Sequence, residues 1–440
     1  MQPLKFVFNM LDRSAAPVIH NAVEFDVKLP GCNRATLANG VPVIAVDAGV
    51  EDVLQIEWVF GAGNCFEQAN MVAAATNHLL KNGTLSRSAY EINEQTDFYG
   101  AYLNRNCFNE TSLVSLHTLS KHLDKLLPVV TDIFSNAIFP QEEIDIFVQN
   151  SRQRLSVNLR KCDFVANREM DVLLYGKEHP YGKYSSFESL DALTREQLVG
   201  FYEQYYKNGS LAIFVSGKLP ADIYTQLDGA FGHLPLKPLL VPKNKPLGLQ
   251  PMDGDNRIVR IENDAQGVQG AIRIARHFPN RHHPDFQKVQ VLNNVFGGYF
   301  GSRLMGNIRE DKGYTYGIHS YLQNHVSQSA WVISTEAGRE VCEAAIREVY
   351  YEMEKLCNDL IGEEELLLVR NYMIGSILGS LDGPFHIIGR WKSYYLNGIE
   401  DGEGYFNQAI DNIKTVSAEE LRALSKKYLQ PAGFYEMVVV

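Results

Sequence analysis

LTREQLVGFYEQYYKNGSLAIFVSG (residues 193–217) and VSAEELRALSKKYLQPAGFYEMVVV (residues 416–440) are two stretches of one chain that align at an offset of 223 residues. With this alignment Glu196 falls on Glu419, and apolar and aromatic positions coincide as well. Each copy opens with a Thr or Ser suited to cap a helix and ends in a run typical of a strand. The sequence therefore predicts one helix–turn–strand unit that occurs twice.

Two matches upstream have nearly the same offset. The Glu-Glu helix start at 142–143 corresponds to 364–365, and the Tyr-Gly pair at 99–100 corresponds to 316–317. These offsets, 222 and 217 residues, differ from the first by only a few residues. Three matches in the same order indicate the duplication of a unit of about half the chain.

Strand-like and helix-like segments follow one another within each half. VPVIAVDAG (41–49), VLQIEWVFGAG (53–63) and SLVSLHTL (112–119) are rich in strand-forming residues, whereas 141–159 is predicted to be one long helix. Because strands follow one another without an intervening helix, antiparallel pairing is expected. The predicted fold class is α+β, with two homologous domains, each a mainly antiparallel sheet packed with helices.

The best candidate for a linker is HLPLKPLLVPKNKPLGLQPMDGDN, residues 233–256. It contains five prolines and no apolar periodicity, so it is expected neither to continue a helix nor to pair inside a sheet. The predicted organisation is an N-terminal domain over 1–232, this linker, and a C-terminal domain over 257–440.

Composition narrows the class of protein. A chain of 440 residues with a net charge of −11 is long enough for two or three domains and lacks the basic face of a nucleic-acid binder. Its six cysteines form no C-x-x-C pair, and no run of apolar residues is long enough to span a membrane, which favours a cytoplasmic location. The charged residues around Arg87 and Lys121 are interpreted as a solvated face.

The segment GAGNCFEQANMVAAATNHLLKNGT, residues 61–84, connects the end of a strand to a helix. It resembles the corresponding segment of the insulinase and pitrilysin-type (inverted-zincin) metallopeptidases, a family that includes the mitochondrial processing peptidase. Those enzymes carry an H-x-x-E-H helix and then a short run to Gly-Thr. Placing the Gly-Thr of 83–84 on that pair puts Ala74 on the first His, Asn77 on the Glu and His78 on the second His.

The zinc chemistry of that family needs all three side chains. Two His residues four positions apart bind Zn²⁺ from one face of a helix, and the Glu accepts a proton from the metal-bound water. Alanine has no donor atom, and an amide cannot accept that proton. His78 alone is interpreted as a helix residue kept for packing or a hydrogen bond, or else as a vestigial or shared ligand.

The resemblance implies a third zinc ligand, a Glu, on the helix that follows the turn at 140–143. In this chain the position falls on Leu155 or Ser156, and no Glu occurs between Glu143 and Glu169. Because three separate positions have lost the required side chain, shifting the alignment by one residue does not restore the site. We therefore expect no metal and no other cofactor in this chain.

The second half carries a further resemblance, in VLNNVFGGYFGSRLMGNIREDKGYTYGIHSYL (291–322). In the same family, G-G-x-x-S-R-L leads to L-R-E-x-x-G-x-x-Y, and Arg309 and Tyr316 fall on that Arg/Tyr pair. The resemblance implies that the pair holds the substrate backbone and the developing oxyanion, for which both groups are suitable hydrogen-bond donors. An Arg paired with Glu310 or Asp311, beside a Tyr packed in a sheet, would give the same pattern.

GAYLNRNCFNETSLVSL (100–116) is similar to the N-A-x-T edge strand of the family, which pairs with extended substrate by β-addition. Asn104 falls on the Asn of that motif, but Arg105 replaces its small residue, which puts direct pairing in doubt. The resemblance runs from about Leu37 to the C-terminus and implies two domains that face each other like a clamshell.

Three functions are compatible with these observations. The first is a non-catalytic subunit of a heterodimeric zinc metallopeptidase, in which Arg309 and Tyr316 act in trans to the zinc of a homologous partner on a peptide or unfolded protein. The second is a purely structural scaffold. The third and least favoured is a self-sufficient zinc peptidase with an unusual metal site.

Overall fold

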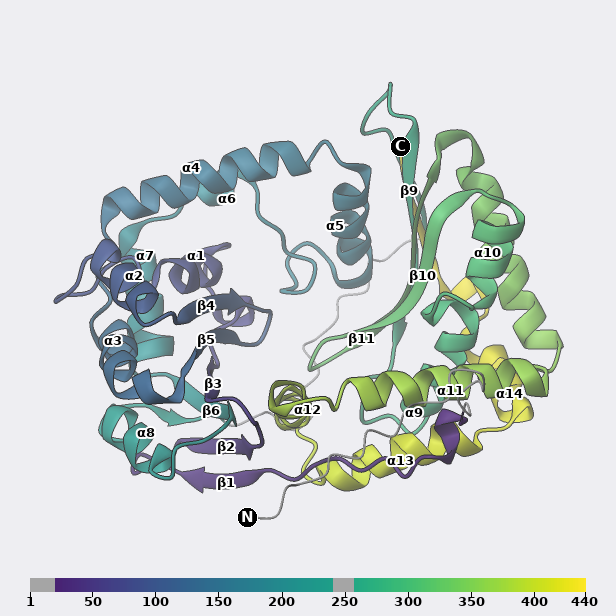
Figure 1. Cartoon of the computed structure of the whole chain (residues 1–440). Helices are drawn as coiled ribbons and strands as arrows, with labels where there is room; N and C mark the ends of the chain where they lie inside the picture. Colours follow the sequence, from purple (N-terminus) through teal and green to yellow (C-terminus); the bar gives the residue numbers. More distant parts are fainter. Residues whose placement is uncertain (1–19, 240–256) are drawn as a thin grey trace, which may run out of the picture.

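The computed structural model describes residues 20–239 and 257–440 of the chain (Figure 1). Two halves, each built from one sheet and several helices, face one another across a central space. The elements of the first half are η1 (Ala22–Glu24), β1 (Asn33–Thr36), β2 (Pro42–Asp47), β3 (Val53–Phe60), η2 (Asn64–Phe66), α1 (Val72–Leu79), α2 (Ala89–Phe98), β4 (Tyr102–Cys107), β5 (Ser112–Leu119), η3 (Ser120–His122), α3 (Leu123–Asn136), α4 (Gln141–Asn158), α5 (Cys162–Tyr175), α6 (Phe187–Asp191), α7 (Arg195–Tyr202), the π-helix η4 (Glu203–Lys207), β6 (Ser210–Gly217), α8 (Ile223–Phe231) and β7 (Lys237–Pro238).

The second half repeats this order with fewer strands. Its elements are β8 (Ile258–Ile261), β9 (Gln269–Phe278), α9 (Phe286–Asn293), the π-helices η5 (Asn294–Gly298) and η6 (Met305–Asp311), β10 (Thr315–Asn324), β11 (Ser329–Gly338), η7 (Arg339–Val341), α10 (Cys342–Asn358), α11 (Glu363–Gly379), α12 (Pro384–Leu396), α13 (Gly402–Thr415), α14 (Ala418–Tyr428), η8 (Pro431–Gly433) and β12 (Tyr435–Val439).

The two sheets have the same strand topology. The first runs β1-β2-β6-β3-β5-β4, with β7 paired to β6, and the second runs β10-β11-β9-β12-β8. In each sheet one strand from late in the half lies between a parallel and an antiparallel neighbour, as β6 lies between β2 and β3 and β12 lies between β8 and β9. The predicted fold class, α+β with two homologous domains, is therefore confirmed.

The repeated unit found in the sequence takes the expected form in both halves. Thr194 caps α7 and Ser417 caps α14, and each belongs to a capping box in which the third residue of the helix bonds back to the cap. The strands β6 and β12 follow. The two long helices that the acidic starts predicted begin at Gln141 and Glu363.

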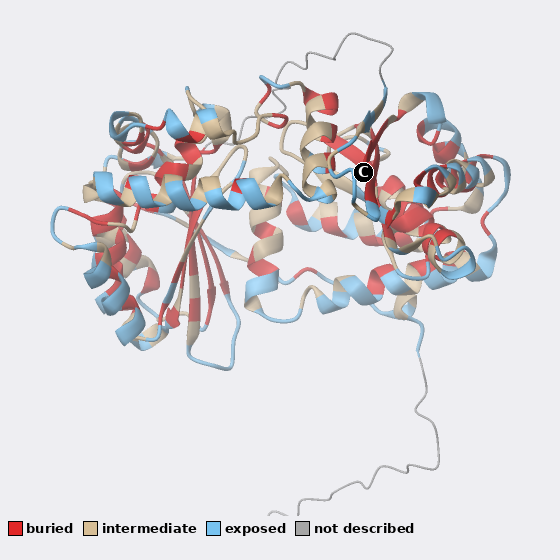
Figure 2. Cartoon of the chain, turned by 90° about the horizontal axis from the view of Figure 1, so that it is seen from above, coloured by how far each residue is buried: buried red, intermediate tan, exposed pale blue. Residues whose placement is uncertain are grey.

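Aromatic side chains fill the core of the first half, on the side of the sheet that the helices cover. Trp58 and Phe60 of β3 meet Phe134 of α3 edge-on, with ring centroids 5.7 and 5.0 Å apart. Figure 2 shows the consequence, because the strands inside this half are largely buried while its outer helices alternate between buried and exposed residues. Apolar burial of this kind is the main stabilising term of each domain.

The halves exchange elements. Helix α12 of the second half packs on β2 and β6 of the first sheet, where the Lys392 amino group lies 2.7 Å from the buried Glu57 carboxylate of β3. In the opposite direction, residues 20–30 run along the second half (purple in Figure 1). There the Val23 N–H donates to the Asn371 side chain at 3.2 Å, and the Trp391 indole donates to the chain at residue 30. Each domain therefore completes its packing with a piece of the other.

A second contact between the halves lies at the turn between β10 and β11. The His325 ring stacks on Tyr181 of the first half with centroids 4.0 Å apart, and its Nδ1 lies 3.1 Å from the Asn109 amide nitrogen. The Tyr181 hydroxyl donates to Glu110. Burial lowers the pKa of His325 to about 4, so the ring is neutral at physiological pH and packs as an aromatic side chain.

The predicted linker begins later than expected. Lys237 and Pro238 pair with β6 as β7, so residues 233–239 still belong to the first domain, and 240–256 lie outside the described residues. The expectation that this stretch does not pair in a sheet is wrong for β7. Buried Leu236 and Leu239 on either side explain the pairing, because they anchor the short strand to the domain.

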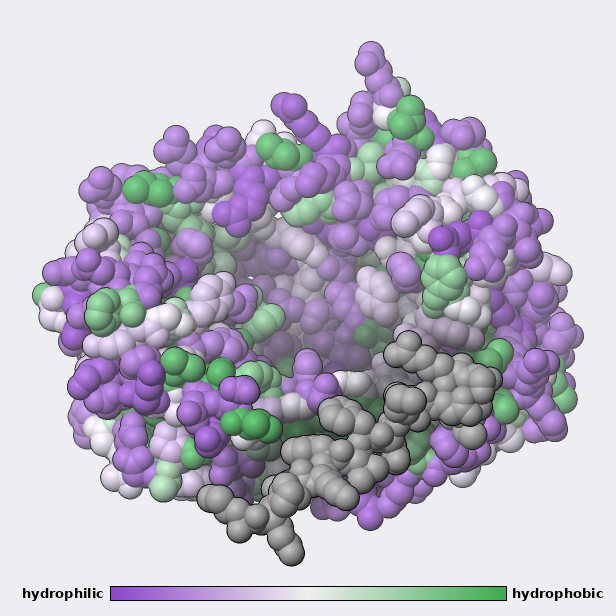
Figure 3. Space-filling view, in the orientation of Figure 1, coloured by the Kyte–Doolittle hydropathy of each residue, from purple (hydrophilic) through white to green (hydrophobic). Residues whose placement is uncertain are grey.

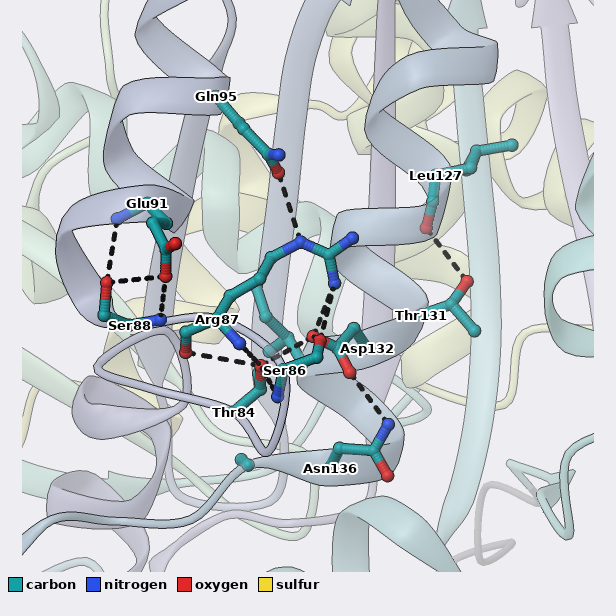
Figure 4. A network of polar contacts seen from close by, with 12 residues as sticks. Thr84, Ser86, Arg87, Ser88, Glu91, Gln95, Leu127, Thr131, Asp132 and Asn136 are labelled. Atoms are coloured by element: carbon teal, nitrogen blue, oxygen red, sulfur yellow. Dashed lines mark hydrogen bonds and ion pairs between the residues drawn. The ribbon is translucent and has the colours of Figure 1, made fainter.

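A polar network fixes the segment that follows α1 (Figure 4). The Asp132 carboxylate of α3 accepts hydrogen bonds from the Thr84 hydroxyl at 2.6 Å and the Ser86 hydroxyl at 2.7 Å. It also accepts from Arg87 at 2.6 Å and from the Asn136 amide at 2.8 Å. The interpretation of Arg87 as part of a solvated face is wrong, because its guanidinium pairs with an aspartate that is only 8% exposed.

The contact between the halves predicts a stability change. Replacing Lys392→Ala leaves the Glu57 carboxylate buried without its cation and is expected to cost about 3 kcal/mol in the free energy of unfolding. The double variant Glu57→Leu/Lys392→Met removes both charges and is expected to recover most of that loss. Urea unfolding checks both; equal losses in the single and double variants would contradict a charge effect.

The network around Asp132 predicts a pH dependence. Burial alone would raise the pKa of Asp132, but hydrogen bonds from Thr84, Ser86, Asn136 and Arg87 outweigh it and hold the pKa below the ordinary 3.8. The stabilisation is therefore present above that pH and lost as the pH falls below it.

We expect Asp132→Asn to lower the free energy of unfolding by about 2 kcal/mol at neutral pH, with a smaller difference as acid protonates the wild-type aspartate. The matched control is Asp124→Asn, an exposed position on the same helix. Denaturant unfolding across a pH series measures both, and a pH-independent difference would count against the assigned role of the carboxylate.

Candidate functional site

Helix α1 begins at a strained residue held by a buried carboxylate. Met71, the residue before the helix, has φ +74°, in the left-handed region that residues other than glycine rarely adopt. The Glu67 carboxylate accepts from the backbone N–H groups of Ala73 at 2.9 Å and of Met71 at 3.3 Å. These bonds satisfy the exposed start of the helix, and burial raises the pKa of Glu67.

The three predicted motif positions of α1 have different surroundings. Ala74 is half-buried, and Asn77 is 2% exposed. The Asn77 amide donates to the Tyr206 hydroxyl at 3.1 Å, which ties α1 to the π-helix η4. His78 is exposed, and its ring lies against Phe147 of α4 with centroids 5.1 Å apart. Asn77 therefore serves the packing of the domain, whereas His78 lies where α1 faces α4.

Of the two candidates for the third ligand position, Leu155 lies on the side of α4 that packs inward. It is buried, and it is eight residues from Phe147, so both lie on one face of the helix. Ser156 is exposed. Leu155 therefore serves the packing of α4, whereas the α4 residue in contact with His78 is Phe147.

The side chains at these positions do not make a zinc site. Zn²⁺ requires three or four nitrogen, sulfur or carboxylate ligands, and here the helix and its neighbour offer a methyl group, an amide engaged with Tyr206, one imidazole and a buried leucine. In residues 20–239 and 257–440 no group of three or more His, Cys, Asp and Glu is placed to hold a metal ion.

Arg309 and Tyr316 are brought together as the sequence predicted. Arg309 lies near the end of η6 and Tyr316 near the start of β10, and the guanidinium carbon is 5.5 Å from the Tyr316 ring centroid. A second ring, Phe300, lies 4.5 Å from the same carbon. Tyr316 is 93% exposed and Phe300 is 62% exposed. The guanidinium is therefore held between two aromatic rings at the surface.

The polar groups of this pair have no partner among the residues that the structure describes. Among the described residues, no ion pair or hydrogen bond involves the Arg309 guanidinium or the Tyr316 hydroxyl, so the alternative pairing of Arg309 with Glu310 or Asp311 does not occur. Phe300 was not singled out from the sequence. The signal in the sequence was the place of this aromatic residue within the glycine-rich segment G-G-Y-F-G (297–301).

Strand β4, which carries Asn104, forms the free edge of the first sheet. It pairs with β5 alone, with Asn104 opposite Ser115. The Asn104 side-chain oxygen accepts from the Arg105 backbone N–H at 2.9 Å. Neighbouring residues alternate sides, and Arg105 reaches toward α1, where it donates to the backbone carbonyl of His78 at 2.5 Å. Arg105 thus links the edge strand to the motif helix.

The surface between the two halves is recessed and polar. Figure 3 shows a hollow on this face of the molecule, lined mostly by hydrophilic residues, between the two halves that Figure 1 separates. One pocket is lined from both halves, and its lining includes Asn109 and Glu110 on one side and Arg281, His325 and Lys392 on the other. A ligand between the halves would meet polar and charged groups from both domains.

No helix in the described part of the chain is long and apolar enough to cross a membrane. All six cysteines are free thiols.

Residues 192–373 match the family described as "Peptidase M16 inactive domain", a range that contains both Arg309 and Tyr316. An uncharacterised zinc protease of Rickettsia felis is 24% identical over 356 residues, which is 79% of this chain and 83% of that protein. The human mitochondrial-processing peptidase subunit beta is 22% identical over 431 residues, which is 93% of this chain and 84% of that protein.

A solved structure agrees in fold. The crystal structure of a peptidase M16 inactive domain from Pseudomonas fluorescens superimposes with a TM-score of 0.81, at 22% identity, over 93% of this chain and 98% of that one. The domain matched at residues 192–373 therefore belongs to the peptidase M16 family, and the chain has the same fold as the solved structure from Pseudomonas fluorescens.

Proposed function

We propose that this chain is the non-catalytic subunit of a heterodimeric zinc metallopeptidase, and that it contributes substrate contacts in trans to a zinc-bearing homologous partner. The observation that carries the proposal is the Arg309–Tyr316 pair, exposed and without an internal hydrogen-bond partner in the described residues, in a chain whose helix α1 offers one imidazole. The substrate is a peptide or an unfolded protein.

The chemistry of the pair supports this role. A guanidinium and a phenol both donate hydrogen bonds, and a peptide carbonyl accepts stronger ones as it gains negative charge during hydrolysis. The rings of Phe300 and Tyr316 restrain the Arg309 side chain, so less entropy is lost when it binds. The pair can therefore orient a carbonyl group and stabilise its developing charge, while the metal and its activated water belong to the partner.

Two further observations support an assembly of chains. The human relative is by name one subunit of a processing peptidase. The free edge of β4 and its Asn104 offer backbone groups to an extended peptide, as sheet edges do in β-addition.

Six free thiols fit the reducing cytoplasm in which we place the protein.

The zinc content of the isolated chain is the first test. We expect the purified protein to contain no stoichiometric zinc, and about a tenfold molar excess of Zn²⁺ to leave its unfolding temperature unchanged, because a ligand stabilises only the state that binds it. Elemental analysis and thermal unfolding measure this. Stoichiometric zinc, together with chelator-sensitive cleavage by the lone chain, would instead establish a self-sufficient peptidase.

The second test uses the reconstituted pair with a homologous chain that has an intact H-x-x-E-H. Arg309→Ala and Tyr316→Phe are each expected to lower kcat/KM for peptide cleavage by about a hundredfold, the typical effect of removing one oxyanion donor. Arg347→Ala, an exposed position on α10, is the control and is expected to leave the rate unchanged. Full activity in both pair variants would favour the scaffold.

A further inference from the structure

Basic side chains lie near His78, the position on which the family resemblance places a zinc ligand. At the end of α1, Arg105 of β4 donates to the backbone carbonyl of His78, and the charges of Arg154 of α4 and of Lys81, just beyond α1, act on the His78 ring. We call Lys81, Arg105 and Arg154 the cationic cluster. Partial burial lowers the pKa of His78, and the charges of Arg105, Arg154 and Lys81 lower it further, so the ring is held in its neutral form.

Arg105 is the most enclosed member of the cluster. One of its terminal nitrogens donates to the His78 carbonyl, but its Nε is buried and has no hydrogen-bond partner. Burial lowers the pKa of this guanidinium to about 10. A partly buried cation with an unsatisfied N–H is unfavourable unless an anion or acceptor from outside completes its bonding.

The described residues do not supply that anion. Among the described residues no ion pair involves a member of the cationic cluster, although acidic residues outnumber basic ones by 52 to 41 in the whole chain. Asp97 acts on Lys81 alone, by raising its pKa against the effects of burial and of Arg105. In the described part of this acidic protein, the two arginines of the cluster therefore have no ion-pair partner, and Lys81 has only the influence of Asp97.

The cluster is open to a ligand from one direction. His78 and Arg154 are exposed, and β4, which carries Arg105, has no strand on its outer side. α1 packs on both β4 and α4, so the three elements converge beside that free edge. An extended chain lying along β4 would pass within reach of these side chains.

We propose that the cationic cluster binds a carboxylate of an extended peptide lying along β4, and that the chain thereby selects acidic peptides. Guanidinium groups recognise carboxylates through paired N–H donors, and two arginines with a lysine beside them match a single carboxylate better than a neutral side chain. The inference rests on the proposed function, since it assumes that peptides bind at this edge. It assigns a binding role to the position that a metal holds in the zinc-bearing relatives.

Binding of matched peptides to the full chain tests the inference. Three decapeptides share one otherwise neutral sequence: one amidated with a central Glu, one amidated with Gln there, and one with Gln and a free C-terminal carboxylate. Isothermal titration calorimetry is expected to show about tenfold tighter binding for a carboxylate peptide than for the neutral one, the usual worth of a charge-assisted hydrogen bond. The comparison of the two acidic peptides identifies the source of the carboxylate.

Variants then locate the effect. Arg154→Gln changes an exposed residue and leaves the core intact, and Arg105→Gln removes the enclosed guanidinium. Both are expected to abolish the preference for the acidic peptide while keeping the affinity for the neutral one. Arg347→Gln removes the same charge from the second domain and is expected to keep the preference.

The outcomes separate the two levels of the account. Equal affinity for acidic and neutral peptides, or a preference that survives in Arg154→Gln and Arg105→Gln, would overturn the cationic cluster as a carboxylate site and leave the proposed function standing. Failure of every peptide to bind the chain, alone and in the reconstituted pair, would overturn both.

Discussion

The packing of α12 against the first sheet determines how the two halves face one another. This helix belongs to the second domain by sequence, yet it covers β2 and β6 of the first, and Lys392 reaches the buried Glu57 from it. Residues 20–30 make the reciprocal contact on the second half. Because each domain is partly covered by a segment of the other, the two domains are fixed relative to one another. The recess between them is therefore part of the fold.

Within that frame, α1 has kept its place but carries different side chains from those of a zinc helix. Its start is held by Glu67 and the segment after it by the Asp132 network, and the helix packs against β4 and α4. Asn77 has become part of the core. The charge that Zn²⁺ would bring is replaced, on our account, by the fixed cations Arg105 and Arg154, which can bind a carboxylate but cannot activate water.

Much of this could be predicted from the sequence because it depends on local pattern or on repetition. Residue types within a short window are enough to predict several elements. These are the caps at Thr194 and Ser417, the strand over 112–119 and the helix from Gln141. The duplication then predicts the shared topology of the two sheets. Arg309 and Tyr316 are only seven residues apart, so a local motif is enough to identify them as a pair.

The features that were missed depend on contacts between residues far apart in the chain. The sequence around Arg87 predicts a surface charge, because its partner, Asp132, lies 45 residues away on another helix. The cationic cluster draws on three elements, and no local pattern places Arg154 beside Arg105. No sequence pattern predicts that α12 and residues 20–30 pack on the opposite half. By sequence, α12 is an ordinary amphipathic helix and residues 20–30 are irregular chain.

The central claim is that this chain completes the active site of a zinc-bearing partner. It is tested most directly by titrating that partner with increasing amounts of this chain and measuring the rate of peptide cleavage. The account predicts a rate that rises with added chain and stops rising at one chain per partner, with no cleavage by this chain alone. A partner whose rate does not change on addition of this chain would contradict it.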